Sequence, residues 1–317
     1  MKQIPVVFST DHNFVVPACV AISTLLRGDS EHAYLIHLLL DADVTDDDKA
    51  MMTRVVEQTS AASAISFIVV ENEFMEAHVE RNITRAAYYR LLIPWLLPQY
   101  DRVIYSDVDI LFCGGGVGAL YEQFDMEGLY VAGANRQSYR QKCPFNQHIL
   151  DLNLDPDKYI NDGFILINAR LQRQDNLLER YKEAASKNMN FMDQDVINVV
   201  CRGKIGYFSE AYNASPQSTI QGAPCHVLHF VGVKPWNIFC LGWSEWWNAY
   251  KESAVFDKKY YEQTLDRQYH KMKQFLVYET LSKRPFIAKC IEWGKKYPWL
   301  DKVVSRMQKL KNKLLRR

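Results

Sequence analysis

Over the first 70 residues, short apolar runs alternate with segments that have the pattern of helices. The runs 4–8, 34–40 and 64–70 are predicted strands, and the segments 17–26 and 46–59 between them are predicted helices. Strands that alternate with helices in this way form a parallel sheet covered by helices on both faces. The sequence therefore predicts an α/β fold.

Local signals mark the helix ends. Pro17 is favoured at a first helical position and Gly28 as a stop signal, while Thr45 and Asp48 have the spacing of a capping pair. Further strands are predicted over 103–112, 129–134, 164–168 and 227–231, and further helices over 84–97 and 193–201.

The chain has 317 residues, of which 48% are hydrophobic, so it can bury a full core and is too long for a lone binding module. The apolar stretch 4–8 is too short for a signal-peptide core. The longest uncharged apolar run, 91–98, is far shorter than the roughly 20 residues of a membrane-spanning helix. Seven scattered cysteines without a C-x-x-C pair point to a reducing, cytosolic environment.

A pair of aspartates, Asp107 and Asp109, lies within the predicted strand 103–112. In an extended chain alternate side chains share a face, so the two carboxylates are expected close together. Hard divalent ions prefer oxygen ligands, so the pair is suited to hold Mn²⁺ or Mg²⁺ against a diphosphate. Two solvated acids at the end of a strand are the alternative, because so short a motif often arises by chance.

Polar residues also follow the first strand, where open α/β sheets bind nucleotides. Asp11 and Asn13 come just after Ser9 and are suited to contact a base or a ribose. Both residue types also serve as helix caps, which is the alternative interpretation.

Three residues close together near position 230 are a further candidate group. His229 is suited to complete a metal site, Gly232 would let the backbone approach a phosphate, and Lys234 would neutralise charge on a leaving diphosphate. A histidine packed after an apolar strand is the alternative. Arg90 is either a diphosphate contact or an arginine whose stem packs on the core.

Two more polar groups lie near predicted elements. Asn161 and Asp162 come ahead of the strand 164–168, and Asp193 and Asp195 open a helix. Their side chains are suited to accept hydrogen bonds from a sugar bound over the edge of the sheet. Acids in the first turn of a helix are also favoured by the helix dipole alone.

Six segments of the chain resemble glycosyltransferase family 8, the retaining sugar transferases that include bacterial lipopolysaccharide galactosyl- and glucosyltransferases and glycogenin. They occur in the family's order over about residues 4–237: FSTDHNF, AAYYRLLIP, VIYSDVDILF, YINDGFILIN, FMDQDVIN and HFVGVKPWN. The resemblance implies a single GT-A (Rossmann-like) domain with a mixed central sheet. It also implies a retaining hexosyltransferase that uses Mn²⁺ (or Mg²⁺) and a nucleotide-diphosphate-sugar, usually UDP-galactose or UDP-glucose.

The resemblance assigns roles to single residues. The metal ligands would be Asp107, Asp109 and His229. The catalytic residues would be Asp193, Gln194 and Lys234. Contacts to the donor would come from Ser9, Asp11, Asn13, Arg90, Asp107, Val108, Asn161, Gly232 and Lys234. Because Gln194 is a poor nucleophile, we expect attack by the acceptor on the face that the diphosphate leaves; double displacement through Gln194 is the rival account.

Three features depart from the family's pattern. One residue separates Gly232 from Lys234, where many relatives have two. Asn135 stands where several galactosyltransferases carry an aspartate that touches the sugar, and Asp162 stands where a small residue is common. The donor sugar therefore stays open.

The net charge of +1 conceals two oppositely charged parts. Residues 283–317 carry twelve basic and two acidic side chains, so residues 1–282 are acidic overall. Over 299–317, apolar side chains recur at helical spacing among lysines and arginines, as in helices that lie on anionic membranes. We predict a GT-A domain over 1–282 and a membrane-association tail over 283–317. A terminal helix docked on the acidic body is the alternative, and no nucleic-acid-binding motif accompanies the charge.

Together these patterns predict a cytoplasmic enzyme, peripheral on the inner face of the cell membrane. It would transfer a hexose from a UDP-sugar to a glycan acceptor, expected to be lipid-linked, in lipopolysaccharide or capsule biosynthesis. One alternative is a family member that acts on a protein or a soluble glycan. The other is a non-enzymatic glycan-binding or membrane-surface protein on the same scaffold, which the complete set of metal ligands disfavours.

Overall fold

The computed structural model describes residues 3–71, 74, 85–135, 144–187 and 189–282. The strands are β1 (Gln3–Thr10), β2 (Ala33–Leu40), β3 (Ala64–Val69), β4 (Arg102–Ser106), β5 (Ile110–Phe112), β6 (Val131–Ala134), β7 (Asn161–Asn168), β8 (Ile205–Tyr207) and β9 (Val227–His229). The α-helices are α1 (Val15–Gly28), α2 (Asp46–Thr59), α3 (Ile93–Leu96), α4 (Val117–Gln123), α6 (Pro144–Asp151), α7 (Ala169–Gln174), α8 (Leu177–Ala185), α9 (Met192–Val200), α10 (Pro216–Ile220), α11 (Trp243–Lys251) and α12 (Lys258–Ser282). The 3₁₀ helices are η1 (His12–Phe14), η2 (Arg85–Leu92), η3 (Pro156–Lys158) and η4 (Glu210–Asn213).

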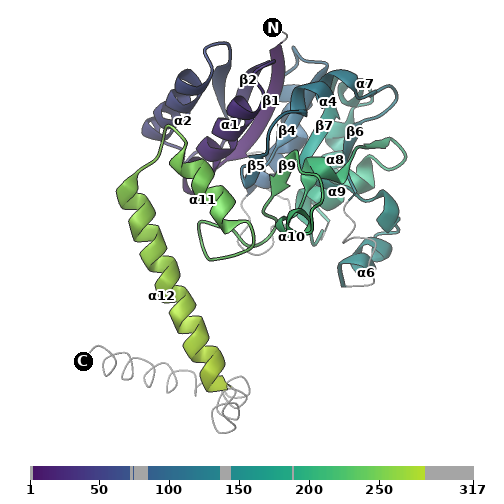
Figure 1. The fold of residues 1–317 in the computed structure, drawn as a ribbon. Helices are drawn as coiled ribbons and strands as arrows, with labels where there is room; N and C mark the ends of the chain where they lie inside the picture. Colours follow the sequence, from purple (N-terminus) through teal and green to yellow (C-terminus); the bar gives the residue numbers. More distant parts are fainter. Residues whose placement is uncertain (1–2, 72–73, 75–84, 136–143, 188, 283–317) are drawn as a thin grey trace, which may run out of the picture. The chain divides into compact units, whose positions relative to one another are not determined.

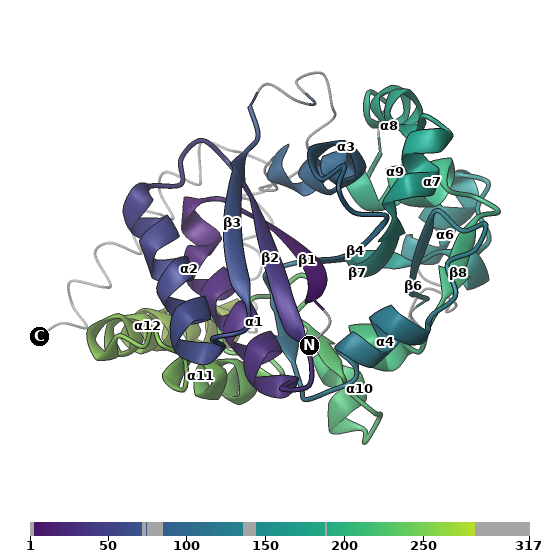
Figure 2. The same cartoon turned by 90° about the horizontal axis from the view of Figure 1, so that it is seen from above.

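Seven strands form the central sheet, in the order β3-β2-β1-β4-β7-β6-β8. Figure 1 labels β2, β1, β4, β7 and β6, and Figure 2 also labels β3 and β8 at the two edges. The strands β3, β2, β1 and β4 run parallel, as the alternation of strands and helices predicts. Beyond β4, β7 runs antiparallel to both β4 and β6, and β8 runs parallel to β6. The sheet as a whole is therefore mixed, as the family resemblance implies.

Helical segments cover both faces of this sheet (Figure 2). On one face α1 and α2 pack against apolar side chains of β1 and β2, including Phe8 and Ile36. On the other face η2, α3, α8 and α9 pack against a second group that includes Val7 and Ile165. The capping pair at the start of α2 is confirmed, because Thr45 accepts from the backbone N–H of Asp48, whose side chain accepts in return from that of Thr45.

The segment predicted as one helix over 84–97 has a different form. The 3₁₀ helix η2 runs to Leu92, and α3 is a single α-helical turn that begins at Ile93. Pro94 has no N–H to donate to the carbonyl of Arg90, and in a continuous α-helix its ring would collide with that carbonyl. The proline therefore separates the two helices.

The strand predicted to run through the aspartate pair is split in two. β4 ends at Ser106 and β5 begins at Ile110, and the residues Asp107–Asp109 form a bend between them. β5 then pairs with β9 in a separate two-stranded antiparallel ladder, with Ile110 opposite His229. The predicted strand 227–231 is thus the shorter β9, which lies outside the central sheet.

The chain forms two compact units. The first comprises Met1–Pro235 and Cys240–Asp257 and contains the whole central sheet. The second comprises Trp236–Phe239 and Lys258–Arg317, and its described residues are 236–239 and the helix α12. The predicted tail, 283–317, lies outside the described residues, so the boundary after residue 282 stays a prediction. Among the described helices, none is both long and apolar enough to cross a membrane.

Candidate active site

The candidate site lies where β1 and β4 end. These parallel strands are in register as far as Phe8 and Ser106, so Asp107 leaves the sheet beside Ser9, which still pairs with Leu39 of β2. The backbone N–H of Asp107 donates to the carbonyl of Gly163 (2.7 Å), near the start of β7. The bend that follows β4 is therefore held against a third strand.

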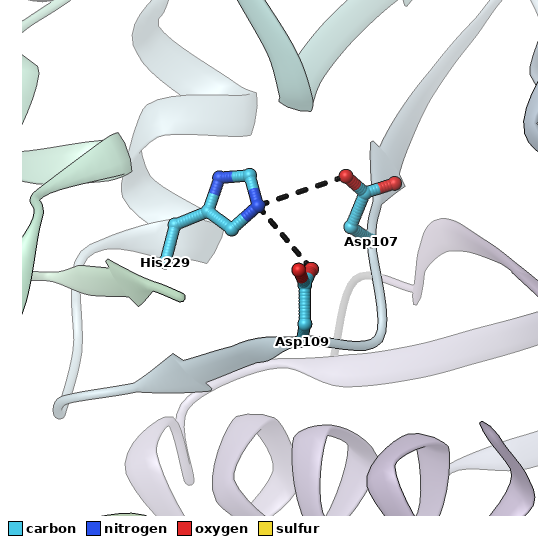
Figure 3. A group of neighbouring side chains, drawn as sticks. All are labelled: Asp107, Asp109 and His229. Carbon is cyan, nitrogen blue, oxygen red and sulfur yellow. Dashed lines mark ion pairs between the residues drawn. The ribbon is translucent and has the colours of Figure 1, made fainter. Parts of the chain in front are cut away.

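Two carboxylates and one imidazole converge at this bend (Figure 3). Nε2 of His229 lies 3.2 Å from Oδ1 of Asp109 and 3.7 Å from Oδ2 of Asp107. One possible ligand atom from each residue lies within 4.8 Å of the others. The carboxylates meet because the chain bends and β5 pairs with β9, not because both share one face of a continuous strand. This set of oxygen and nitrogen donors suits a divalent ion such as Mn²⁺.

Gly163 leaves open the space that this cluster occupies. A Cβ atom at Gly163 would lie 2.2 Å from Cε1 of His229 and 2.8 Å from Oδ2 of Asp107, closer than packed atoms approach. The strand β7 therefore comes this close to the candidate ligands only because position 163 has no side chain.

The backbone of Gly163 also fixes the direction of a hydrogen-bond chain. Its N–H donates to Oδ1 of Asn161 (3.2 Å), which accepts a second bond from Nδ2 of Asn213 (2.7 Å). Oδ1 of Asn213 therefore faces Nδ1 of His229 (2.9 Å), and that ring nitrogen carries the proton. Nε2 of His229 faces the two carboxylates, where it is placed to bind a cation that lies between them.

The chain continues from Asn161 in the other direction. Nδ2 of Asn161 donates to Oε1 of Gln194 (2.6 Å), and Nε2 of Gln194 donates to the hydroxyl of Tyr159 (3.1 Å). The Tyr159 hydroxyl donates to Oδ1 of Asp195 (2.5 Å), and Nε2 of His148 lies 2.8 Å from Oδ2 of the same carboxylate. Both ends of the Gln194 amide are therefore held by buried partners.

Arg90 is buried among three carboxylates. Its Nη2 pairs with Asp107 (2.8 Å) and its Nη1 with Asp162 (3.0 Å). Its Nε pairs with Asp193 (2.7 Å), and the guanidinium lies 4.3 Å from the ring centroid of Tyr105. Burial raises the pKa of both Asp162 and Asp193, and a hydrogen bond joins these two carboxyl groups. A proton shared between them relieves their repulsion.

Arg90 pairs with the first of the two candidate carboxylate ligands, Asp107, and Lys234 pairs with the second, Asp109. Its ammonium group forms an ion pair with Oδ2 of Asp109 and donates to the carbonyl of Phe230 (2.9 Å). Burial alone would raise the pKa of Asp109, but the positive charge of Lys234 and the contact with His229 lower it below its usual value. Asp109 is therefore ionised at neutral pH.

The residues expected to contact the nucleotide lie along the same edge. Asp11 caps η1 by accepting from the backbone N–H of Asn13 (2.9 Å), and burial together with Asp43 and Asp41 raises the pKa of Asp11. Asn13 is exposed. Asp11 and Asn13 are placed near the candidate metal ligands by the pairing of β1 with β4.

Val108 and Gly232, the other residues predicted to contact the donor, would do so through their backbone atoms. The side chain of Val108 is buried in the core beside α1. Gly232 follows β9 with a φ of +84°, and a Cβ there would meet nothing within 4 Å. The glycine therefore permits a left-handed turn in an open position two residues before Lys234.

Sequence reasoning missed three residues of the hydrogen-bond chain, which are Tyr159, Asn213 and His148. Asn213 ends η4, and Ala214 and the strand β9 hydrogen-bond each other, which brings Asn213 beside His229. No motif near Asn213 marks this role. Asn135, noted as a departure, donates to the carbonyls of Pro156 (2.8 Å) and Tyr159 (2.6 Å).

The sequence of this chain matches a known protein family. The model of the family described as glycosyl transferase family 8 matches residues 5–240. A putative glycosyltransferase of Haemophilus influenzae is 22% identical over 216 residues, which are 67% of this chain and 63% of that protein. The chain thus matches less than two thirds of that relative's length. The lipopolysaccharide 1,3-galactosyltransferase of Salmonella typhimurium is 23% identical over 267 residues, 79% of this chain and 76% of that protein.

A solved structure has the same fold. The galactosyltransferase LgtC, solved in complex with donor and acceptor sugar analogues, matches with a TM-score of 0.71 at 20% identity. The match covers 82% of this chain and 99% of that one. The predicted α/β fold of the GT-A type, with its mixed central sheet, is therefore confirmed.

We expect Gly163→Ala to weaken Mn²⁺ binding at least about 10-fold, because the added methyl group displaces His229 and Asp107. Isothermal titration calorimetry measures the affinity. Gly128→Ala is the matched control: its Cβ would meet nothing within 4 Å, while its φ of +68° makes the substitution strained. Equal loss of affinity in both variants would contradict the close approach of β7 to the cluster.

We expect Asn213→Ala to weaken Mn²⁺ binding by about 10- to 100-fold, because Nδ1 of His229 loses its acceptor. Asn213→Asp keeps an oxygen facing Nδ1 and should recover part of the affinity, although it loses the donor to Asn161. An affinity in Asn213→Ala equal to that of the unaltered protein would show that the orientation of His229 does not depend on Asn213.

Proposed function

The chain belongs to glycosyl transferase family 8 and is a glycosyltransferase, and we propose that it transfers galactose or glucose from a UDP-sugar to a glycan acceptor with retention of anomeric configuration. One observation carries this proposal: the carboxylates of Asp107 and Asp109 converge with His229 beside two cationic side chains. A site of this composition is suited to a diphosphate, whose departure is the demanding part of glycosyl transfer.

The residues present fit a divalent cation. Two carboxylate oxygens and Nε2 of His229 face one another, and Gly163 leaves them room. When bound by Asp107, Asp109 and His229, such an ion would supply positive charge that stabilises the diphosphate leaving group. We assign Mn²⁺, or Mg²⁺, to this role.

Lys234 supplies a second positive charge. Its ammonium pairs with Asp109, on the side of that carboxylate opposite to the oxygen facing His229. We propose that Lys234 turns from Asp109 to the diphosphate when the donor binds. The open, left-handed turn at Gly232 is where the backbone adjusts to this movement.

The sugar would lie near Asp193 and Gln194, at the start of α9. Asp193 is held by Arg90, and the Gln194 amide is held at both ends. An amide oxygen has two lone pairs, and Oε1 of Gln194 uses one of them to accept the hydrogen bond from Asn161. The other is available to a positively charged sugar, which favours Gln194 as a fixed dipole over Gln194 as a nucleophile. Because Gln194 then forms no bond to the sugar, the acceptor attacks on the same face that the diphosphate leaves.

The carboxyl groups around Arg90 would select the sugar. Carboxyl groups of Asp107, Asp162 and Asp193 can each accept a hydrogen bond from a sugar hydroxyl. The protonated form that burial favours for Asp162 can also donate one. Galactose and glucose differ in the direction of one hydroxyl group, and both fit such a mixed set of donors and acceptors.

The acceptor is proposed to be a lipid-linked glycan. The Salmonella relative is named for transfer to lipopolysaccharide. The basic residues in 283–317 would bind an anionic membrane surface and bring the enzyme to such an acceptor. We therefore propose a cytoplasmic enzyme that is peripheral on the inner face of the cell membrane.

In a hydrolysis assay across UDP-, GDP- and ADP-sugars with Mn²⁺, we expect the unaltered enzyme to cleave UDP-galactose or UDP-glucose fastest. Asp109→Ala should lower that rate at least about 100-fold, because a metal ligand is lost. Asp125→Ala, which alters an exposed turn, is the control and should retain the rate. Unaltered turnover in Asp109→Ala would refute the metal site, and preference for another nucleotide would refute the donor.

For the tail, truncation after Ser282 should abolish sedimentation with vesicles that contain anionic phosphatidylglycerol, while donor hydrolysis persists. The full chain should release from these vesicles at high salt, because the attraction between the tail and anionic lipid is screened. Neutral phosphatidylcholine vesicles are the control. Continued sedimentation of the truncated chain would refute the tail as the membrane contact.

A further inference from the structure

Two cysteines far apart in the sequence meet at one end of the β5–β9 ladder, whose other end carries His229. Cys113 directly follows β5, and Cys225 lies two residues before β9. Their Sγ atoms are 3.5 Å apart, and Cys113 is exposed while Cys225 is partly exposed. The pair is therefore accessible to a small reagent from solvent.

The pair lies at the opposite end of the β5–β9 ladder from His229. His229 pairs with Ile110, and the ladder runs through Leu111 and Leu228 to Phe112 and Val227. It continues with a bond from the N–H of Cys113 to the carbonyl of His226 (2.8 Å). A link between the two sulfurs would thus join the ends of the two strands that flank the candidate metal ligands.

The two thiols are chemically unlike each other. The S–H of Cys225 donates to the sulfur of Cys113, and this bond lowers the pKa of the Cys113 thiol. The same bond, together with burial, raises the pKa of Cys225. Cys113 is therefore the better nucleophile, since the thiolate is the reactive form.

The other described cysteines differ from this pair. Burial raises the pKa of Cys19 and Cys201 to about 12, so both are inert. Cys240 is partly buried, and burial raises its pKa as well. Among the described cysteines, Cys113 has its pKa shifted toward reactivity.

We propose that Cys113 and Cys225 are an oxidation site that closes to a reversible disulfide by exchange with low-molecular-weight disulfides. The Cys113 thiolate attacks one sulfur of the small disulfide, forms a mixed disulfide and releases one small thiolate. The Cys225 thiol then loses its proton to solvent, attacks the Cys113 sulfur and releases the second small thiolate. The two protein thiols are oxidised and the small disulfide is reduced to two thiols.

Closure needs a short movement. A disulfide bond is about 2.05 Å long, so the sulfurs approach by roughly 1.5 Å from their separation of 3.5 Å. The backbone beyond Cys113 is held, because the N–H of Gly115 donates to the carbonyl of Gly28 (2.7 Å). The approach therefore falls to rotation of the two cysteine side chains and to the exposed segment before Cys225.

The bond would constrain a ladder that is short. Three residue pairs are too few for a two-stranded sheet to be stable by itself. A link between residues more than 100 positions apart removes much of the freedom of the unfolded chain. The oxidised form should therefore be more stable, with the strands beside Asp109 and His229 held together.

The test treats the full chain with oxidised glutathione at pH 8 and measures free thiols, non-reducing peptide masses and the melting temperature. We expect two thiols to be lost, a peptide joined through Cys113 and Cys225, and a monomeric product. The melting temperature should rise by roughly 5–10 °C and return on addition of dithiothreitol.

Single variants separate the two steps. Cys225→Ser should stop at a stable mixed disulfide on Cys113, whereas Cys113→Ser should react much more slowly. Cys240→Ser is the matched control and should close as the unaltered chain does. No loss of thiols, pairing of Cys113 with another cysteine, or a disulfide-linked dimer would each overturn the proposal.

Discussion

One guanidinium group shared by three carboxylates determines how the site is assembled. Arg90 lies on η2, and its partners come from the end of β4, the start of β7 and the first turn of α9. A buried carboxylate without a partner is costly, because it loses its hydration. The cluster therefore requires four distant segments of chain to meet, and the apolar packing of η2 and α9 against the sheet brings them together.

This cluster also sets the charge that a ligand meets. The four acids of the site are Asp107, Asp109, Asp162 and Asp193. Against them stand Arg90, Lys234 and the proton that burial favours on Asp162. With His229 counted as a neutral imidazole, the form that binds a metal, one net negative charge remains, which repels a diphosphate. A divalent ion reverses its sign, so under the proposed function the donor would bind well only to the metal-loaded enzyme.

The sequence predicted much of this because many functional residues lie in local patterns. Alternating strands and helices predicted β1 to β3 with α1 and α2, and Asp107 and Asp109 were evident from their spacing. Non-local packing could not be predicted in the same way. β5 and β9 are too short to show a period, so their separate ladder left no signal. Asn213 acts through a partner 52 positions away, Asn161, and nothing in its own segment marks it.

The chain of amides that starts at Gly163 has a polarity. Each side-chain amide has a donor end and an acceptor end, and each is placed head to tail with the next. Turning over one member alone would set two donors or two acceptors against each other, so the members can reverse only together. The main-chain N–H of Gly163 forbids that reversal, since it always donates. A single peptide group thus breaks the symmetry between two otherwise equivalent arrangements and determines, at both ends at once, which atom His229 and Gln194 present.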